Sequence, residues 1–211
     1  MKKILYGSVA MIYRFLHKVA GIKRRVDSLY YFAQLRQSHV VFNEHSLKIF
    51  GTCKLRISPS SHVELGDDVV IRGGTNDTID FGSGSRIDVA EGASLRIGYR
   101  SGISNTNIYC HEKIEIGDYV NIGAGCMIMD TNFHSTDWII RRDRAKDIGV
   151  AKTKPVVIGD DVFIGAKSII CKGVTIGNKS MVAAGSVVVS NIGVGELWGG
   201  NPAVFLKKLK I

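Results

Sequence analysis

The chain has 211 residues, enough for one substantial domain or for one domain with a small appendage. Hydrophobic residues make up 45% and charged residues 22%, and 24 Gly against 3 Pro indicate many tight turns rather than disordered linkers. The formal net charge is +9, but residues 1–38 hold eight Lys/Arg against one Asp, so the rest of the chain is nearly neutral. This distribution argues against a general nucleic-acid binder.

Residues 1–38 have the apolar spacing of a helix. Apolar side chains recur at steps of three and four from Leu5 to Ala33, so the sequence predicts a basic amphipathic helical segment. The apolar face either packs on the protein or on a neighbouring subunit, or rests on an anionic membrane surface. Arg14 and Lys18 interrupt the apolar run, so neither a secretory signal nor a spanning helix is expected.

Residues 39–193 show a different period, in which large aliphatic residues recur every six positions. A period of six excludes one long helix, whose face recurs every 3.6 residues, and simple hairpins, which have longer strands. Short strands that turn a corner every six residues form a coil, and stacked coils bury a continuous core. The clearest in-phase positions are Ile116, Ile122, Ile128, Ile158, Ile164, Ile170, Ile176, Val182 and Val188.

The cysteines are also predicted to lie in this core. Cys53, Cys110, Cys126 and Cys171 lie far apart without a CxxC motif, so we expect them to be reduced and buried, as in a cytoplasmic protein. Cys126 stands two residues before Ile128, a small inward position, and is interpreted as core packing rather than as a nucleophile.

The block VIGDDVFIGAKSIICKGVTIGNKSMVAAGSVVVS resembles the repeats of the hexapeptide-repeat acyltransferases. This resemblance is specific from about residue 87 to 206, weaker over 40–86 and absent from 1–38. It implies an all-β fold, a left-handed parallel β-helix, and a homotrimer whose active sites lie between subunits. We expect residues 194–211 to cap the last coil as a short tail or helix.

The period breaks between residues 128 and 158, and we predict an excursion loop over residues 131–156. At its start, DTNFH resembles a segment of the maltose/galactoside O-acetyltransferase branch, which implies that His134 is the general base. The same resemblance makes Asp130, Asn132 and the earlier Asn107 candidates for binding the acceptor. Asp130 has two further interpretations: it orients the imidazole, or it caps the corner turn. The alternative for Asn107 is a simple turn residue.

The resemblance also implies a coenzyme A site. Ala166 and Ala184 match the small residues along which the pantetheine arm lies, and the C-terminal segment GGNPAVFLKKLKI resembles the closing segment whose cations meet the phosphates. Since Val204 follows Ala203 where the family has a basic residue, Lys207 and Lys208 are the candidates; their alternative is a solvated tail.

These expectations combine into acetyl-CoA-dependent O-acetylation of a sugar hydroxyl, in surface polysaccharide or lipopolysaccharide biosynthesis. A sugar N-acetyltransferase, an antibiotic acetyltransferase and a non-catalytic scaffold are the alternatives on this fold. No metal is expected: a zinc carbonic anhydrase of this fold needs three histidines, and residues 87–206, where the resemblance is specific, contain only His111 and His134. We expect a cytoplasmic location, either free or peripheral to the inner face of the plasma membrane, and a carbohydrate acceptor, either free or lipid-linked.

Overall fold

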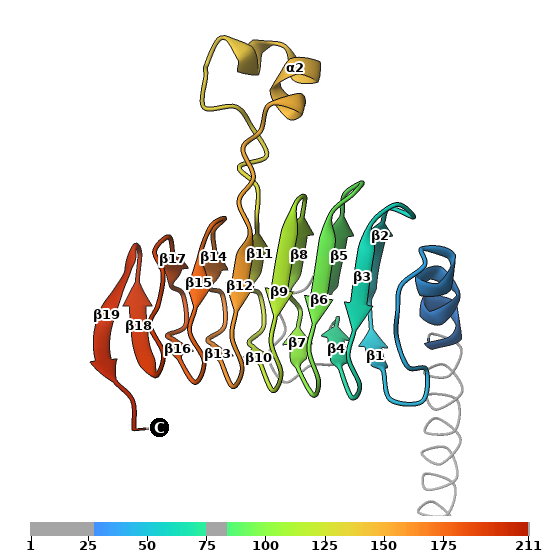
Figure 1. The fold of residues 1–211 in the computed structure, drawn as a ribbon, viewed down its shortest axis with the longest axis horizontal. Coiled ribbons are helices and arrows are strands. Elements are labelled where there is room, and N and C mark those ends of the chain that lie inside the picture. The colour runs from blue at the N-terminus through green and yellow to red at the C-terminus, as the bar shows by residue number, and fades with distance from the viewer. Residues whose placement is uncertain (1–27, 75–83, 211) are drawn as a thin grey trace, which may run out of the picture.

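A computed structural model describes residues 28–74 and 84–210 of the chain. The strands form three sheets, parallel except for the last strand, β19 (Ala203–Lys208), that wrap around one core as the faces of a triangular prism, shown from the side in Figure 1. The predicted left-handed β-helix is therefore confirmed. Most of the predicted N-terminal helical segment, residues 1–27, lies outside the described residues.

Each of the three sheets is named by how many strands it contains, and its strands are given in the order in which they pair. The eight-stranded sheet consists of β1 (Lys48–Gly51), β4 (Val70–Gly73), β7 (Gly102–Ser104), β10 (Asn121–Ile122), β13 (Phe163–Ile164), β16 (Met181–Val182), β18 (Glu196–Gly200) and β19 (Ala203–Lys208). The six-stranded sheet consists of β17 (Val187–Val188), β14 (Ile169–Ile170), β11 (Met127–Met129), β8 (Asn107–Cys110), β5 (Ser85–Val89) and β2 (Cys53–Ile57). The five-stranded sheet consists of β15 (Thr175–Ile176), β12 (Val156–Ile158), β9 (Lys113–Ile116), β6 (Ser94–Ile97) and β3 (His62–Leu65).

The six-residue period places large aliphatic side chains from all three sheets inside the prism. All nine in-phase positions from Ile116 to Val188 are buried, with exposed fractions of 0–3%. The small positions between them are buried too, and Ser168, Ser180 and Ser186 donate their hydroxyls to carbonyl oxygens 2.6–2.7 Å away. Burying each Ile contributes on the order of 2 kcal/mol, so the stacked aliphatics are the main source of stability.

The corners between the five- and eight-stranded sheets repeat one hydrogen-bonding pattern. The Asp118 carboxylate accepts from the Tyr99 amide, Asp160 from the Asp118 amide, and Asn178 from the Asp160 amide, at 2.8–3.1 Å. The residue that follows each acidic or amide residue has a positive φ, for example 56° at Tyr119. Each side chain thus satisfies the backbone of the coil before it, which locks the coils in register.

The described part of the N-terminal helix, residues 28–37, packs against the first coil. Leu35 is buried, the Tyr31 hydroxyl donates to the Gly51 carbonyl at 2.9 Å, and the Cys53 amide donates back to that hydroxyl at 3.0 Å. The helix therefore covers the open end of the core, as the packing interpretation predicts for these residues. Within the part of the chain that the structure describes, no helix is long and apolar enough to cross a membrane.

The other end is closed by strands, so the expectation of a C-terminal tail or helix is wrong. Strand β18 adds to the eight-stranded sheet in parallel with β16, and β19 returns antiparallel along its edge. Glu196 holds this hairpin by accepting from Lys208 Nζ and Trp198 Nε1 at 2.8 Å and from the Gly193 amide at 2.9 Å. The Lys208 contact, followed by the other two, lowers the pKa of Glu196 to about 2.

The cysteine prediction holds with one correction. All four cysteines are free thiols, and Cys53, Cys110 and Cys126 are buried, but Cys171 is only half-buried because it lies at a corner. Burial raises the pKa of the Cys126 thiol to about 11, and its Sγ contacts the Gly165 carbonyl at 3.2 Å. This agrees with its interpretation as core packing.

Candidate active site

The interruption in the repeat is a loop that stands away from the prism on a narrow stalk (Figure 1). Strand β11 ends at Met129 and β12 begins at Val156, which confirms the predicted excursion. In the stalk, Thr131 pairs with Thr153 in an antiparallel bridge, and the Asn132 amide donates to the Lys152 carbonyl at 3.0 Å. The loop leaves the edge between the six- and five-stranded sheets, called the loop edge below.

Asp130 at the base of the stalk is a turn-capping residue. It is fully buried, and its carboxylate accepts from the backbone amides of His111, Glu112 and Lys113 at 2.7–2.8 Å. Because both oxygens are engaged and no surface is exposed, the predicted acceptor-binding role is wrong, and the turn-cap interpretation is correct. Asn132 is exposed in the stalk, and its acceptor contact stays a prediction.

Phe133 anchors the beginning of the loop on the prism. Its ring packs edge-on against Tyr109 and His111, with centroid distances of 5.2 and 5.8 Å. Its backbone has a φ of +60°, and its amide donates to the Thr131 hydroxyl at 3.0 Å. The sharp turn with an anchored ring fixes the direction in which the next residue, His134, leaves the stalk.

His134 forms a short hydrogen bond with Asp147. The distance from Nδ1 to the Asp147 Oδ2 is 2.6 Å, and the other oxygen, Oδ1, accepts from the Ser135 amide at 2.7 Å. Since the hydrogen bond from His134, and next that from Ser135, lowers the pKa of Asp147, this carboxylate is ionised at neutral pH. An ionised acceptor requires a proton on Nδ1, so in the neutral form of the imidazole the lone pair is on Nε2. The imidazole is 66% exposed, so a substrate can reach it.

The rest of the loop holds Asp147 in place. Asp147 lies on the short helix α2 (Arg144–Gly149) and is only 4% exposed. Asp143 caps that helix by accepting from the Ala145 and Lys146 amides, and the 3-10 turn η1 (Ile140–Arg142) precedes it. Arg141 donates to the Ser135 carbonyl at 2.8 Å, which joins the turn to the His134 segment.

Sequence reasoning missed Asp147. It lies thirteen residues after His134 at the end of the run RRDRAKD, which looks like a solvated charged face. Its position relative to His134 depends on how the irregular loop folds, and no period encodes that. The only available signal was an acidic residue in the same loop as the proposed base, which many loops contain.

The predicted coenzyme residues Ala166 and Ala184 stack at the edge between the eight- and six-stranded sheets, called the alanine edge below. Ala124 precedes them in the same column: the Lys167 amide donates to the Ala124 carbonyl and the Gly185 amide to the Ala166 carbonyl, at 2.8–2.9 Å. Ala166 is half-buried and Ala184 exposed. Their small side chains leave the corner backbone reachable for a ligand that forms amide hydrogen bonds.

The two lysines predicted to contact phosphates differ in whether their charge is paired. Lys208 donates to Glu196, so its charge is paired inside the terminal hairpin. Lys207 is exposed on the same strand and has no ion pair among the residues that the structure describes. Lys207 is therefore the better candidate for a phosphate contact, and Lys208 has a structural role at least.

Within one chain, the candidate base and the candidate coenzyme residues lie on different edges of the prism. His134 projects from the loop edge, whereas Ala166 and Ala184 follow β13 and β16 at the alanine edge. Asn107 begins β8 directly after the alanine edge, so it too lies away from its own His134. One face, the six-stranded sheet, separates the two edges.

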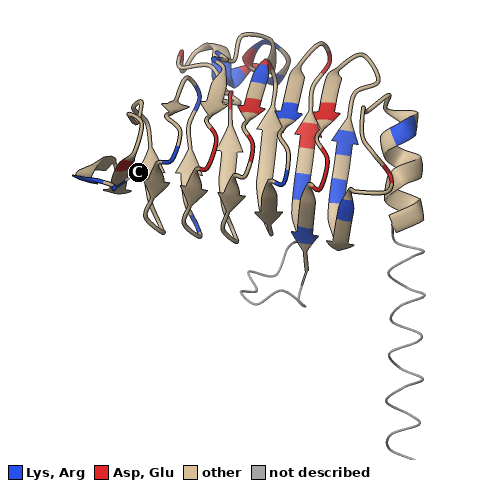
Figure 2. Cartoon of the chain, turned by 60° about the horizontal axis from the view of Figure 1, so that its bottom comes forward, with Lys and Arg blue, Asp and Glu red and all other residues tan. Residues whose placement is uncertain are grey.

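The outer surface of that six-stranded sheet is mostly uncharged toward the C-terminal end. One row across its strands consists of Asn107, Met127, Ile169 and Val187, all half-buried. Figure 2 shows charges of both signs on the strands near the N-terminal helix and few on the strands of the other end. Apolar side chains without charges are typical of a surface that meets another subunit.

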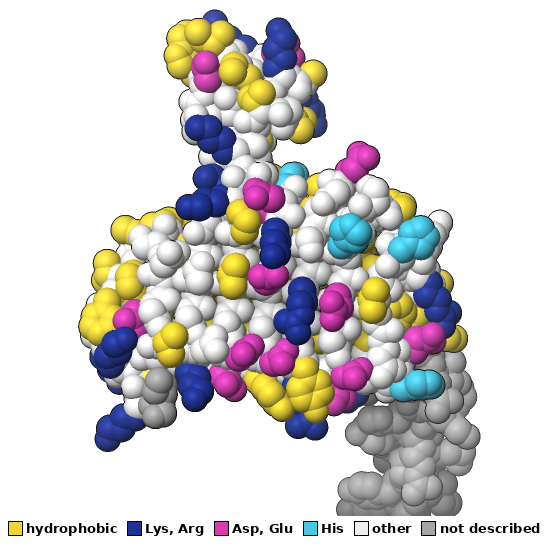
Figure 3. Space-filling view, in the orientation of Figure 1, with side chains coloured by type: hydrophobic (Ala, Val, Ile, Leu, Met, Phe, Trp, Pro, Cys, Tyr) yellow, Lys and Arg dark blue, Asp and Glu magenta, His cyan; other side chains and the backbone are white. Residues whose placement is uncertain are grey.

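The tip of the loop combines apolar and basic side chains, as the space-filling view shows (Figure 3). Trp138, Ile139 and Ile148 are 58–59% exposed, and the Arg142 guanidinium lies 4.6 Å from the Trp138 ring centroid. Apolar side chains this exposed on a projecting loop indicate contact with another surface.

Comparison with known proteins supports the repeat fold. The family model described as hexapeptide repeat of succinyl-transferase matches residues 155–190. A hexapeptide-repeat acetyltransferase from Vibrio cholerae, solved in complex with acetyl coenzyme A, is 41% identical, with a TM-score of 0.50 over 56% of this chain and 61% of that one. A galactoside acetyltransferase solved with coenzyme A is 24% identical, with a TM-score of 0.51 over 67% and 65%, which shows the fold alone.

Curated relatives match over shorter stretches. A 2,3,4,5-tetrahydropyridine-2,6-dicarboxylate N-acetyltransferase from Clostridium perfringens is 49% identical over 55 residues, 26% of this chain and 23% of that protein. A mitochondrial gamma carbonic anhydrase 2 from Arabidopsis thaliana is 46% identical over 54 residues, 25% and 19% of the two chains. The chain thus spans about a quarter of the length of these relatives or less, and the shared repeats occur with different activities.

Proposed function

We propose that this chain, which belongs to the hexapeptide-repeat family, is an acetyl-CoA-dependent O-acetyltransferase that acts on a sugar hydroxyl. The observation that carries the proposal is the His134–Asp147 pair, which fixes an exposed imidazole as a proton acceptor at the start of the loop. The likeness to an acetyltransferase solved with acetyl coenzyme A supports the choice of donor. The DTNFH segment supports the sugar acceptor.

His134 acts as the general base in this proposal. Nε2 takes the proton of the acceptor hydroxyl, and the oxygen bonds to the carbonyl carbon of the acetyl thioester. When the C–S bond breaks, the protonated imidazole returns the proton to the leaving thiolate. Asp147 holds the productive tautomer and stabilises the imidazolium, so it is a positioning residue.

The alanine edge would hold acetyl-CoA, which supplies the activated acetyl group. The column of Ala124, Ala166 and Ala184 fits this role because small side chains leave the corner backbone open along the stack. Lys207 is available for the phosphates. The matched Vibrio cholerae protein has acetyl coenzyme A bound, which supports a site of this kind.

A homotrimer would bring base and donor together. Three copies that turn their six-stranded sheets toward a common axis set the loop edge of each beside the alanine edge of the next, because these two edges bound that sheet. The uncharged outer row of this sheet and the apolar loop tip suit such contacts. His134 of one copy then serves acetyl-CoA held by its neighbour.

The acceptor chemistry and the cellular place are the finer parts of the proposal. An amine acceptor is the second candidate, because the curated proteins similar to this chain include an N-acetyltransferase and the same base serves both. We favour a hydroxyl of a surface polysaccharide or of a lipid-linked precursor, modified in the cytoplasm. Contact of residues 1–27 with the membrane lies outside the described residues and stays part of this proposal.

The test is acetyl-CoA binding by calorimetry, followed by thiol release with a panel of sugars and aminosugars, on wild type and His134→Ala. We expect both proteins to bind acetyl-CoA and only wild type to turn over, with a loss of about 10²- to 10⁴-fold in His134→Ala. His62→Ala, an exposed histidine of β3, is the control and should keep full activity.

Each outcome has one meaning. Absence of acetyl-CoA binding by the wild type would refute the donor, and equal turnover by His134→Ala would refute the base. Acetylation of aminosugars alone would replace the O-acetyltransferase with an N-acetyltransferase. A sedimentation mass equal to that of a single 23.0 kDa chain in an active preparation would refute the trimer.

A further inference from the structure

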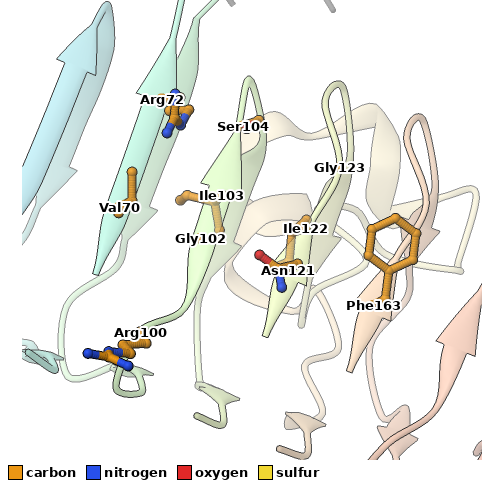
Figure 4. A pocket seen from close by; sticks show the side chains of 10 residues that line it. All are labelled: Val70, Arg72, Arg100, Gly102, Ile103, Ser104, Asn121, Ile122, Gly123 and Phe163. Atoms are coloured by element: carbon orange, nitrogen blue, oxygen red, sulfur yellow. The ribbon is translucent and has the colours of Figure 1, made fainter. Parts of the chain in front are cut away.

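The outer face of the eight-stranded sheet carries a hollow of about 350 Å³ (Figure 4). It lies in a row of outward residues that runs across the strands through Val70, Gly102, Asn121 and Phe163. Gly102 has no side chain to fill its place in that row, so the surface is depressed between its neighbours. Arg72 and Ser104 line the hollow on one side and Arg100 on the other.

The backbone does not require glycine at this position. Gly102 is not among the residues with a positive φ, and a Cβ there would lie 3.6 Å from the Asn121 Oδ1 and 3.9 Å from the Val70 carbonyl oxygen, which are ordinary contacts. A side chain would therefore fit the fold and would occupy the hollow. The glycine is explained by the space that it leaves rather than by the turn chemistry that explains glycines at the corners.

The hollow lies where the proposed active site needs an acceptor. Gly123 lines it at the end of β10 and packs on the alanine edge so closely that a Cβ on it would lie 2.7 Å from the Ala166 nitrogen. The same coil continues into β11, from which the loop leaves, so the loop of a neighbouring copy in the trimer would stand at the height of the hollow. His134 of that copy would then approach across the alanine edge, beside the donor.

The lining favours an anion. Both ionisable residues of the lining are arginines, and both side chains are exposed. Arg72 contacts the Phe50 ring at 5.6 Å and has no acidic partner among the described residues, while Arg100 contacts the Tyr99 ring at 5.2 Å and has Asp68 at 3.6 Å. Guanidinium groups are suited to bidentate contacts with carboxylates and phosphates.

The other lining groups suit a sugar. Phe163 is 44% exposed and offers an aromatic face for a pyranose ring, and Asn121 and Ser104 offer hydrogen bonds to hydroxyls. An aromatic wall with a few converging polar groups is the usual make-up of a small-molecule site.

We propose that this hollow is the acceptor subsite and that it selects sugars bearing a carboxylate or a phosphate. The inference rests on the proposed function for its place in the reaction. Its two possible anion sources share one chemistry, and separate probes can distinguish them.

The test measures sugar binding without turnover, by calorimetry on the full chain. The probes are methyl β-glucuronide for a carboxylate, glucose 1-phosphate for a phosphate, and methyl β-glucoside as the neutral reference. We expect one anionic probe to bind at least about tenfold more tightly than the neutral one, and Arg72→Gln and Arg100→Gln each to remove about tenfold of that preference. Arg96→Gln, an exposed arginine of β6 on the five-stranded sheet that pairs with Asp118, should change nothing.

Gly102→Val is the second arm. It fills the hollow at a strand position that suits a β-branched residue, so it should abolish binding of all three probes while the melting temperature stays within a few degrees. Gly102→Ala replaces it if Val disturbs the fold, with a smaller expected loss of binding.

The results separate the two proposals. Equal binding of neutral and anionic probes by the wild type, or unchanged binding by Arg72→Gln and Gly102→Val, would overturn the acceptor subsite even if acetyl-CoA binds. If the wild type does not bind acetyl-CoA but still binds anionic sugars more tightly than the neutral one, the transferase proposal is refuted and the anion site is retained.

Discussion

The prism and the excursion loop are stabilised in opposite ways. In the prism, aliphatic side chains spaced six residues apart are buried throughout, and hydrophobic burial dominates. Among residues 131–155, the buried side chains are Thr131, Ser135 and Asp147, all polar, so hydrogen bonds determine the conformation of the loop. The stacked hydrophobic core supplies stability and determines where on the prism the loop begins. The polar loop can position one imidazole accurately while contributing little to stability.

The largest expected effect tests the prism side of this comparison. Ile164→Ala removes a fully buried side chain between neighbouring coils and leaves a cavity, so we expect a loss of about 2–5 kcal/mol in the free energy of unfolding. Ile148→Ala, an exposed isoleucine on the loop, should change it by less than about 0.5 kcal/mol. Denaturant unfolding of both variants measures the difference.

The large loss of stability in Ile164→Ala should not be accompanied by a loss of turnover. Ile164→Ala should keep its turnover per folded molecule at a temperature where it remains folded, because the Ile164 side chain faces the core and reaches neither proposed binding surface. Equal destabilisation by both substitutions would show that the loop belongs to the cooperative core and would contradict the contrast.

The next effect tests the loop. Asp147→Asn keeps the size of the side chain but replaces one carboxylate oxygen with an NH₂ group, which cannot accept a hydrogen bond. The remaining oxygen cannot accept from both His134 Nδ1 and the Ser135 backbone N–H. We expect turnover to fall by about 10- to 100-fold with unchanged acetyl-CoA affinity, since the imidazole is no longer held in one tautomer. The loss should be smaller than for His134→Ala because water can reach the exposed ring.

A tautomer measurement separates positioning from simple loss of structure. In the wild type, nitrogen NMR should show His134 protonated at Nδ1, and in Asp147→Asn a mixture of the two tautomers. Asp143→Asn in the same loop is the matched control, because Asn also caps helices well, so its rate and spectrum should match those of the wild type. A wild-type His134 protonated at Nε2 would refute the assigned hydrogen bond.

The sequence predicted the prism well and the loop poorly. The spacing from Ile116 to Val188 determined the fold, the edges and the limits of the loop, because each strand repeats one constraint. The DTNFH segment located His134, but Asp130 was assigned to the acceptor although it caps a turn, and Asp147 was not identified at all. Both errors concern polar side chains whose partners depend on the tertiary path of an irregular segment.

Lys208 and Gly102 show the same limit on the prism itself. The sequence places Lys208 in a basic tail, but only the hairpin shows that Glu196 pairs with it. Gly102 looks like another turn glycine until its place in the middle of a sheet row is known. Periodicity predicts which residues face inward, and it carries no information about what gathers on the outer faces.

The smallest effect tests the hairpin that closes the prism, where a polar contact stabilises the regular part. The pKa of Glu196 is about 2 in the folded chain against about 4.3 for a free glutamate, because the carboxylate accepts from Lys208, Trp198 and Gly193. A lowered pKa means that this stabilisation is fully present above about pH 4.3 and is lost as the pH falls toward 2. Glu196→Gln should therefore weaken hydrogen-exchange protection of the β19 amides at neutral pH and flatten its decline between these two pH values. Glu115→Gln, which removes an ion pair with Lys113 on the exposed surface of β9, should leave β19 protection unchanged. If the protection of β19 falls as steeply with acid in Glu196→Gln as in the wild type, the hairpin is held by its strand pairing alone. The Glu196 contacts would then contribute nothing to the stability of the prism, and polar contacts would matter only in the loop.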